Sequence, residues 1–126
     1  MAAYDDITTA VRWCVASDDT PARAHLLAAV LWGVVHQAHT EEVGELVEAV
    51  LARWPAPTAA PAAGEGAVEP FRADAVATAA TCRSQLGDYA GAIELAAAAL
   101  AGPDADTSPY APVTLRRALG HAHRAA

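Results

Sequence analysis

The sequence contains no lysine: all eight basic residues are arginine, against fifteen Asp and Glu, for a net charge of −7. A chain this acidic is poorly suited to wrapping nucleic acid or to lying on an anionic membrane. Only two of the 126 residues are cysteine, Cys14 and Cys82. Two are too few for the disulfide framework of a small secreted protein, so we expect buried, reduced thiols and a cytoplasmic location.

Long apolar segments are also missing. The longest strongly apolar run is Leu26–Val35, ten residues that would rise about 15 Å as a helix, half of a bilayer's hydrocarbon core. The N-terminal residues, Met1–Asp6, are acidic and lack the apolar core of a signal peptide. The sequence therefore predicts no membrane partner.

Aromatic residues make up only 6% of a chain that is 54% apolar, and about 35 residues are alanine. Small side chains favour closely packed helices, whereas sheets favour β-branched and aromatic residues. No segment alternates apolar and polar residues with the period of a strand. We expect an all-α fold in one domain over residues 1–126, since the length allows only one.

Helix start and stop signals predict about six helices. Thr20-Pro21 combines a hydroxyl cap with proline at the first helical position, and Thr40 is expected to cap the next helix. The helix after Pro21 is apolar on nearly every face, so we expect it in the middle of the bundle. The expected ranges are 5–17, 21–39, 40–54, 71–86, 89–101 and 109–126, the last opened by Pro109.

Four of these helices carry an apolar stripe at helical spacing, which predicts their buried faces. The predicted buried residues are Ile7, Ala10, Val11, Cys14 and Val15; Val43, Leu46, Val47, Val50, Leu51 and Trp54; Phe71, Ala75, Ala79, Cys82 and Leu86; and Ala92, Ile93, Ala96, Ala99 and Leu100.

Residues 55–70 contain four prolines and two glycines, which exclude regular structure. The segment is either an ordered crossing loop or a mobile linker. We do not expect it to separate two domains, because neither side alone buries enough apolar surface.

Gly87–Ile93 resembles the central turn of a tetratricopeptide repeat, with Gly87 in a left-handed conformation and Asp88 as the cap of the next helix. The resemblance implies antiparallel helix hairpins in a right-handed superhelix, with close helix contacts at Ala80, Ala92 and Ala99. Val76 and Arg83 stand where the motif has Trp and Tyr.

The same frame fits the chain twice more. Ala38–Pro55 matches the turn and second helix of a divergent copy, and Leu119-Gly120-x2-His123 matches part of a further first helix. That last copy lacks its second helix, which would leave an apolar face open. This predicts that the chain is a piece of a longer protein or that its last helix caps the array. If the last helix lacks its partner, we expect dimerisation through it.

A more specific resemblance covers residues 4–126. Asp5-Asp6-Ile7-x3-Val11-Arg12-Trp13, His25–Trp32 and His39-x2-Glu42-x5-Glu48 resemble a helical region of actinobacterial SARP-type and LuxR-type transcriptional regulators. There it follows an ATPase module and a winged helix. Ala38 departs from the family's usual Gly, and the long Pro/Ala loop is atypical. The resemblance implies a sensory or protein-interaction arm.

No phosphate-binding loop, CxxC pair, HExxH or GxSxG motif occurs, so we expect neither an enzyme nor a cofactor. His36 and His39, three residues apart with Glu41 or Glu42 nearby, would be the most plausible metal ligands. A solvated turn between helices explains them better, and we expect no metal.

The repeat resemblance implies that one face of each first helix lines a concave groove. The implied groove residues are His25, Ala28, Trp32, Val35 and His36; Asp74, Ala77, Thr81, Ser84 and Gln85; and Thr114, Arg117, His121, Arg124 and Ala125. From these we select as the partner-binding site Trp32, His36, Thr81, Gln85, Arg117, His121 and Arg124. Arg117, His121 and Arg124 share one helix face and would receive an acidic peptide segment. The alternative is that Arg116, Arg117 and Arg124 are ordinary solvated cations near a helix C-terminus, where the dipole favours them.

The functional hypothesis is therefore a non-catalytic module that binds a protein or peptide and relays a signal within a bacterial transcriptional regulator. A second hypothesis is a small-molecule sensor with an apolar pocket near Trp32. An enclosed pocket at Trp32 would favour the sensor, and an open groove with exposed arginines would favour the peptide binder.

Overall fold

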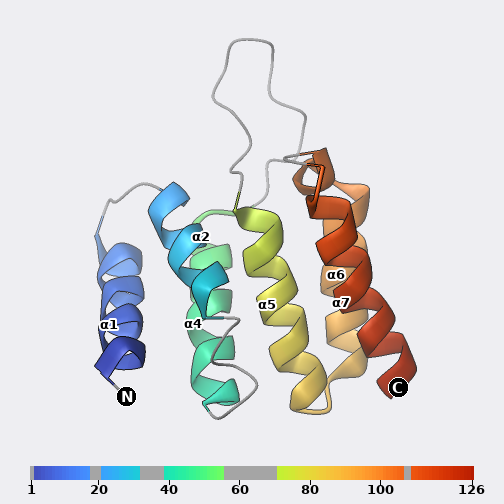
Figure 1. Cartoon of the computed structure of the whole chain (residues 1–126), viewed down its shortest axis with the longest axis horizontal. Coiled ribbons are helices and arrows are strands. Elements are labelled where there is room, and N and C mark those ends of the chain that lie inside the picture. The colour runs from blue at the N-terminus through green and yellow to red at the C-terminus, as the bar shows by residue number, and fades with distance from the viewer. Residues whose placement is uncertain (1, 18–20, 32–38, 56–70, 107–108) are drawn as a thin grey trace.

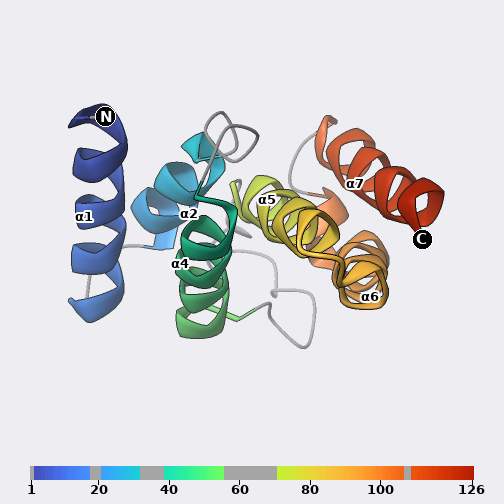
Figure 2. The same ribbon diagram turned by 90° about the horizontal axis from the view of Figure 1, so that it is seen from below.

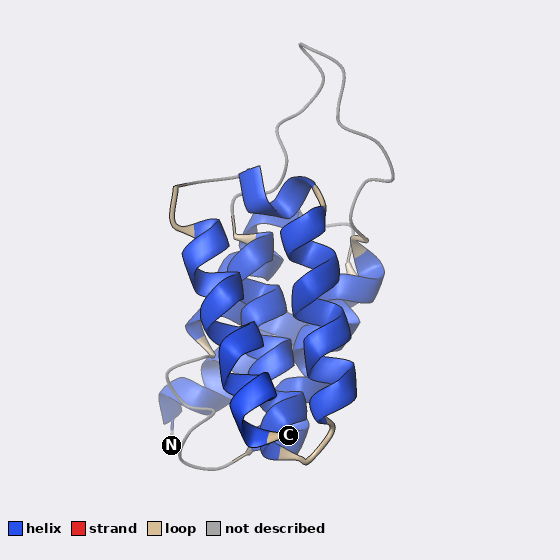
Figure 3. Cartoon of the chain, turned by 90° about the vertical axis from the view of Figure 1, so that its right-hand side faces the viewer, coloured by secondary structure: helices blue, strands red, loops and turns tan. Residues whose placement is uncertain are grey.

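The computed structural model describes residues 2–17, 21–31, 39–55, 71–106 and 109–126. These ranges form six α-helices and one short 3₁₀-helix, and no strand occurs among them (Figure 3). The predicted all-α class is therefore confirmed. The proline-rich segment 56–70 lies outside the described residues.

The helices pack side by side along the long axis of the molecule, with neighbouring helices antiparallel (Figure 1). Helix α1 (Ala2–Ala16) lies at one end and contacts α2 (Pro21–Val30) and α4 (Thr40–Arg53). Helices α6 (Tyr89–Ala101) and α7 (Ala111–Ala125) pack on each other at the far end, and α5 (Arg72–Gln85) lies between the two groups.

Helix α5 is the centre of the molecule, because it contacts α2, α4, α6 and α7 and ten of its fourteen residues are buried. The prediction that the helix after Pro21 occupies the centre was wrong. Helix α2 ends at Val30, where the sequence predicted 39, and residues 32–38 lie outside the described residues. Leu26 and Val30 are 43% and 50% exposed. Helix α5 is central because its Ala, Ser, Thr and Cys side chains let four helices approach closely, which outweighs its lower hydrophobicity.

The turn between α5 and α6 forms as predicted. Gly87 adopts φ +90°, in the left-handed region that glycine tolerates. The Asp88 carboxylate then accepts a hydrogen bond from the backbone N–H of Gly91 at 2.9 Å and caps α6. The local residues alone determine this turn, which explains the accuracy of the prediction.

Three other predicted boundaries or positions were wrong. Thr40 is the first helical residue and not the cap: His39 precedes it at φ 67°, and the Thr40 hydroxyl donates to Gln85 across to α5 at 3.1 Å. The last helix starts at Ala111 and not at Pro109, because Pro109 and Tyr110 form a turn and Pro112 occupies the first helical turn. Leu86 is 57% exposed, since it lies past the end of α5 where the chain reverses.

Small residues form the closest helix contacts. Ala80, Ala92 and Ala99 are 1%, 0% and 7% exposed, as the repeat resemblance implied. A further close approach, which the sequence analysis missed, joins α4 to α5: a Cβ at Gly44 would lie 3.2 Å from the Cβ of Cys82. These contacts hold the helices at short range along the whole row.

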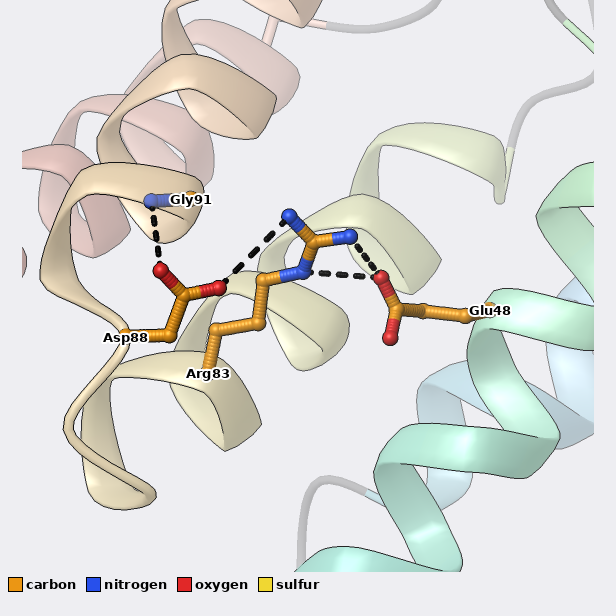
Figure 4. Close-up of polar contacts among 4 residues, drawn as sticks. All are labelled: Glu48, Arg83, Asp88 and Gly91. Atoms are coloured by element: carbon orange, nitrogen blue, oxygen red, sulfur yellow. Dashed lines mark hydrogen bonds and ion pairs between the residues drawn. The ribbon is translucent and has the colours of Figure 1, made fainter.

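Arg83 joins three helices at one end of the bundle (Figure 4). Its Nε donates to the Glu48 carboxylate of α4 at 2.7 Å, and its Nη2 donates to the same oxygen. Its Nη1 lies 3.9 Å from the Asp88 carboxylate that caps α6. Arg83 thus forms an ion-pair network that links α4, α5 and α6, because Glu48 and Asp88 lie on the two neighbouring elements.

Polar contacts hold α1 against α4. The Tyr4 hydroxyl donates to Glu42 at 2.6 Å, Arg12 pairs with the other Glu42 oxygen at 2.5 Å, and the Tyr4 ring stacks on His39 at 4.2 Å between centroids. Burial raises the pKa of Tyr4 to about 12, and the hydrogen bond from Tyr4 lowers the pKa of Glu42.

Among the described helices, none combines the length and apolarity needed to cross a membrane.

Candidate functional site

Helices α2, α5 and α7 form one side of the molecule. In the view of Figure 2, α2 and α7 lie on one side of the row, α4 and α6 lie on the other, and α5 lies between them. Helix α5 therefore forms the floor between α2 and α7. These are the three helices whose faces the repeat resemblance assigns to a groove.

A cavity of about 290 Å³ opens between these helices. We call it the groove cavity. Its lining comes from all three helices: Ala29 from α2, Asp74, Ala77 and Thr78 from α5, and Val113, Thr114 and Arg117 from α7. The lining combines apolar methyl groups, two hydroxyls, one carboxylate and one guanidinium.

The two charged groups of the groove cavity lie on different helices. The Asp74 side chain is half-buried, and the loss of solvent around it raises its pKa. Arg117 is exposed on α7. Within the described ranges, neither side chain takes part in an ion pair or a side-chain hydrogen bond. No described side chain therefore competes with a ligand for either charge.

Exposed apolar side chains flank the groove cavity. Leu26 lies three residues before Ala29, so these two share one side of α2, and Val30 follows Leu26 by four residues. Val113, which lines the cavity from α7, is 61% exposed. Two helices thus present apolar groups beside the same opening, which would favour a partner that buries them.

The structure places the predicted binding residues in several surroundings. Arg117 lines the groove cavity, and His121 and Arg124 are exposed on the following turns of α7. Thr81 is 4% exposed, whereas Gln85 is exposed at the end of α5 and accepts a hydrogen bond from Thr40. The remaining two predicted residues, Trp32 and His36, lie outside the described residues, and so does the pocket expected near Trp32.

The wider set of implied groove residues includes three more that line the groove cavity, namely Asp74, Ala77 and Thr114. Sequence reasoning missed Ala29, Thr78 and Val113. Ala29 directly follows an implied groove residue, and Thr78 lies four residues after Asp74 and therefore shares its helix face. Val113 carries no sequence signal of its own, since its exposure depends on how α7 is rotated about its axis.

His25 was expected in the groove, but it is 1% exposed. Its ring meets the Trp54 ring edge-on at 6.2 Å between centroids, and neither ring nitrogen has a hydrogen-bond partner. Burial, together with the nearby Arg72 charge, lowers the pKa of His25 to about 4. The rotation of α2 turns this residue into the core, and neither His25 nor the equally buried Ala28 lines the groove cavity.

The other reactive side chains are buried. Cys14 and Cys82 are both 1% exposed, and burial with the nearby Glu48 charge raises the pKa of Cys82 to about 12. A thiol with such a pKa is a poor nucleophile. Over the residues described, no group of three His, Cys, Asp or Glu side chains is placed to hold a metal ion. What the groove cavity offers is binding surface.

No protein-family model, curated protein or solved structure matches this chain. The geometry of the groove cavity is therefore the basis on which a function can be proposed.

Proposed function

We propose that this protein is a non-catalytic module that binds a segment of a partner protein along α5, between α2 and α7. From the resemblance to actinobacterial regulators, we further propose that it is the signal-relay arm of a bacterial transcriptional regulator. The proposed fold is a tetratricopeptide-like array, in which α2, α5 and α7 are the first helices of successive hairpins.

The observation that carries the proposal is the lining of the groove cavity by three helices that are distant in sequence. The cavity is open to solvent, and it has apolar groups at its edges and a charged group on each of two walls. Such a surface provides both buried area and orientation for an extended segment.

A small-molecule sensor is the second candidate. A volume of about 290 Å³ lies at the lower end of the range found for small-ligand pockets. However, a sensor pocket encloses its ligand, and the groove cavity continues to exposed apolar side chains on α2 and α7. That continuity favours a peptide.

Selection of a displayed random peptide library on the wild-type protein tests the proposal. Ala29→Leu places extra side-chain volume in the groove cavity, whereas Ala97→Leu makes the same change on the exposed surface of α6. We expect selected peptides to bind wild type and Ala97→Leu equally and to lose at least about tenfold in affinity on Ala29→Leu. Peptides that bind all three proteins equally, or a selection that enriches none, would overturn the proposal.

Amide chemical-shift mapping of a selected peptide separates the two candidates. A bound segment perturbs amides in α2, α5 and α7 well beyond the groove cavity. Perturbations confined to the residues that line the cavity, produced equally by a small fragment, would favour the sensor.

A further inference from the structure

The Asp74 carboxylate is the most informative group in the groove cavity. It is half-buried among methyl groups and hydroxyls, and no described residue supplies a counter-ion or a side-chain hydrogen bond. Removing a carboxylate from water is unfavourable unless it is paired or hydrogen-bonded. A ligand that brings a positive charge would supply the missing partner.

Neither Thr78 nor Arg117, which line the same cavity, is a partner of the Asp74 carboxylate. Thr78 points its hydroxyl at the backbone carbonyl of residue 74, at 3.0 Å, so this hydroxyl is not donated to the carboxylate. Arg117 lines the same cavity from α7 but lies outside ion-pair distance. Asp74 also lies in the first turn of α5, where the helix dipole stabilises a negative charge. That stabilisation does not require the carboxylate to line a cavity.

The charge of the whole chain points the same way. A net charge of −7 attracts cationic partners and repels anionic ones at long range. The three residues of α7 that were predicted to receive an acidic segment, Arg117, His121 and Arg124, are exposed, where ion pairs contribute little. Among the charged groups of the groove, the partly desolvated carboxylate therefore dominates recognition.

We infer that the groove cavity accepts a lysine or arginine side chain of the partner segment, with the Asp74 carboxylate as its counter-ion. The inference rests on the proposed function and specifies its ligand chemistry. The aliphatic part of the side chain lies against Ala29, Ala77 and Val113, and its charged end meets Asp74. Arg117, a like charge on the opposite wall, opposes this guest and would favour an anionic one.

This opposition gives a test in which two substitutions change affinity in opposite directions. The probe is Nα-acetyl-arginine amide, and its binding is followed by amide chemical shifts around the groove cavity. We expect Asp74→Asn to weaken binding about tenfold, since a charge-assisted hydrogen bond is lost. Arg117→Gln should tighten binding about twofold, because an exposed like charge is removed. Glu94→Gln, which removes one negative charge from the exposed face of α6, is the matched control and should leave affinity unchanged.

Further probes and one further variant remove the remaining ambiguities. The uncharged Nα-acetyl-norleucine amide should bind at least about tenfold more weakly than the arginine derivative. Asp74→Glu keeps the charge and should retain most of the binding that Asp74→Asn loses. Melting curves of each variant establish that it is folded.

Several results would overturn the inference. They are equal binding of the norleucine and arginine derivatives, tighter binding of Nα-acetyl-glutamate amide, reversed effects (tighter binding by Asp74→Asn and weaker binding by Arg117→Gln), or no saturable shift with the arginine derivative. The library selection separates this inference from the proposed function. If the selected peptides bind the groove but carry no basic residue at a fixed position, binding of a cationic side chain is refuted and the proposed peptide-binding function is retained. If the arginine derivative binds in a way that depends on Asp74 but no peptide binds the groove, binding of a cationic side chain is retained and the proposed peptide-binding function is refuted.

Discussion

His25 makes the stability of this protein sensitive to mild acid. The side chain is buried against Trp54 without a hydrogen bond to either ring nitrogen, and its pKa falls from 6.5 to about 4. In the unfolded chain the imidazole regains its ordinary pKa. Protonation therefore stabilises the unfolded state before it stabilises the native state.

The magnitude follows from the two pKa values. Between pH 6.5 and about 4 the unfolded chain binds about one more proton at this site than the native protein, so stability falls as pH falls. Each pKa unit is worth about 1.4 kcal/mol, which gives a loss of about 3 kcal/mol by pH 4 and no further loss from this group below it. Small domains are stable by about 5–15 kcal/mol, so the loss is large.

Urea denaturation at a series of pH values, followed by circular dichroism, measures this loss. His25→Leu and His25→Gln both remove the titrating group, so each should lose about 3 kcal/mol less than wild type between pH 7 and pH 4, whatever its stability at pH 7. Ala97→Gln, on the exposed surface of α6, removes no titrating group and should follow the wild-type pH dependence. If both His25 variants lose as much stability as wild type, the reasoning from burial is refuted.

Three further predictions concern other buried or capping groups. Asp104 is 1% exposed and pairs with Arg72, so Asp104→Ala should lower the free energy of unfolding by about 3–5 kcal/mol. Urea denaturation measures this change, and a loss below about 1 kcal/mol would contradict the buried pair. Asp88→Ala removes the cap of α6 and should cost about 1 kcal/mol in the same assay, whereas unchanged stability would show the cap to be unimportant. The buried thiols of Cys14 and Cys82 should react with a disulfide reagent at pH 8 only as fast as the protein unfolds. Comparing the reaction rate with and without urea checks this, and a rapid reaction in the native protein would be incompatible with their burial.

Features that depend on neighbouring residues were predicted well from the sequence. The Gly87 turn and the Asp88 cap each need only a few adjacent residues, and both form as expected. Predictions that depended on hydrophobicity alone were less successful. The apolar α2 is exposed at Leu26 and Val30, while the less hydrophobic α5 is the centre, because small side chains and not apolar ones decide how many helices can pack around one.

The groove illustrates the same limit. The repeat frame selected the three helices that line the groove cavity, and Asp74 and Arg117 were among the residues it implied. It also assigned His25 to the groove, although that residue is buried. A sequence frame counts positions along a helix, but it does not contain the rotation of each helix about its own axis.

By itself, the sequence determined the helical class, the positions of most helix ends and the use of alanine at close contacts, since these depend on backbone preferences and side-chain size. Only the tertiary structure decided that Ala29, Asp74 and Arg117 meet at one cavity and that Arg83 joins α4, α5 and α6. The physical reason is that the offset and rotation of packed helices result from all their contacts at once, and no local segment of the chain contains that information.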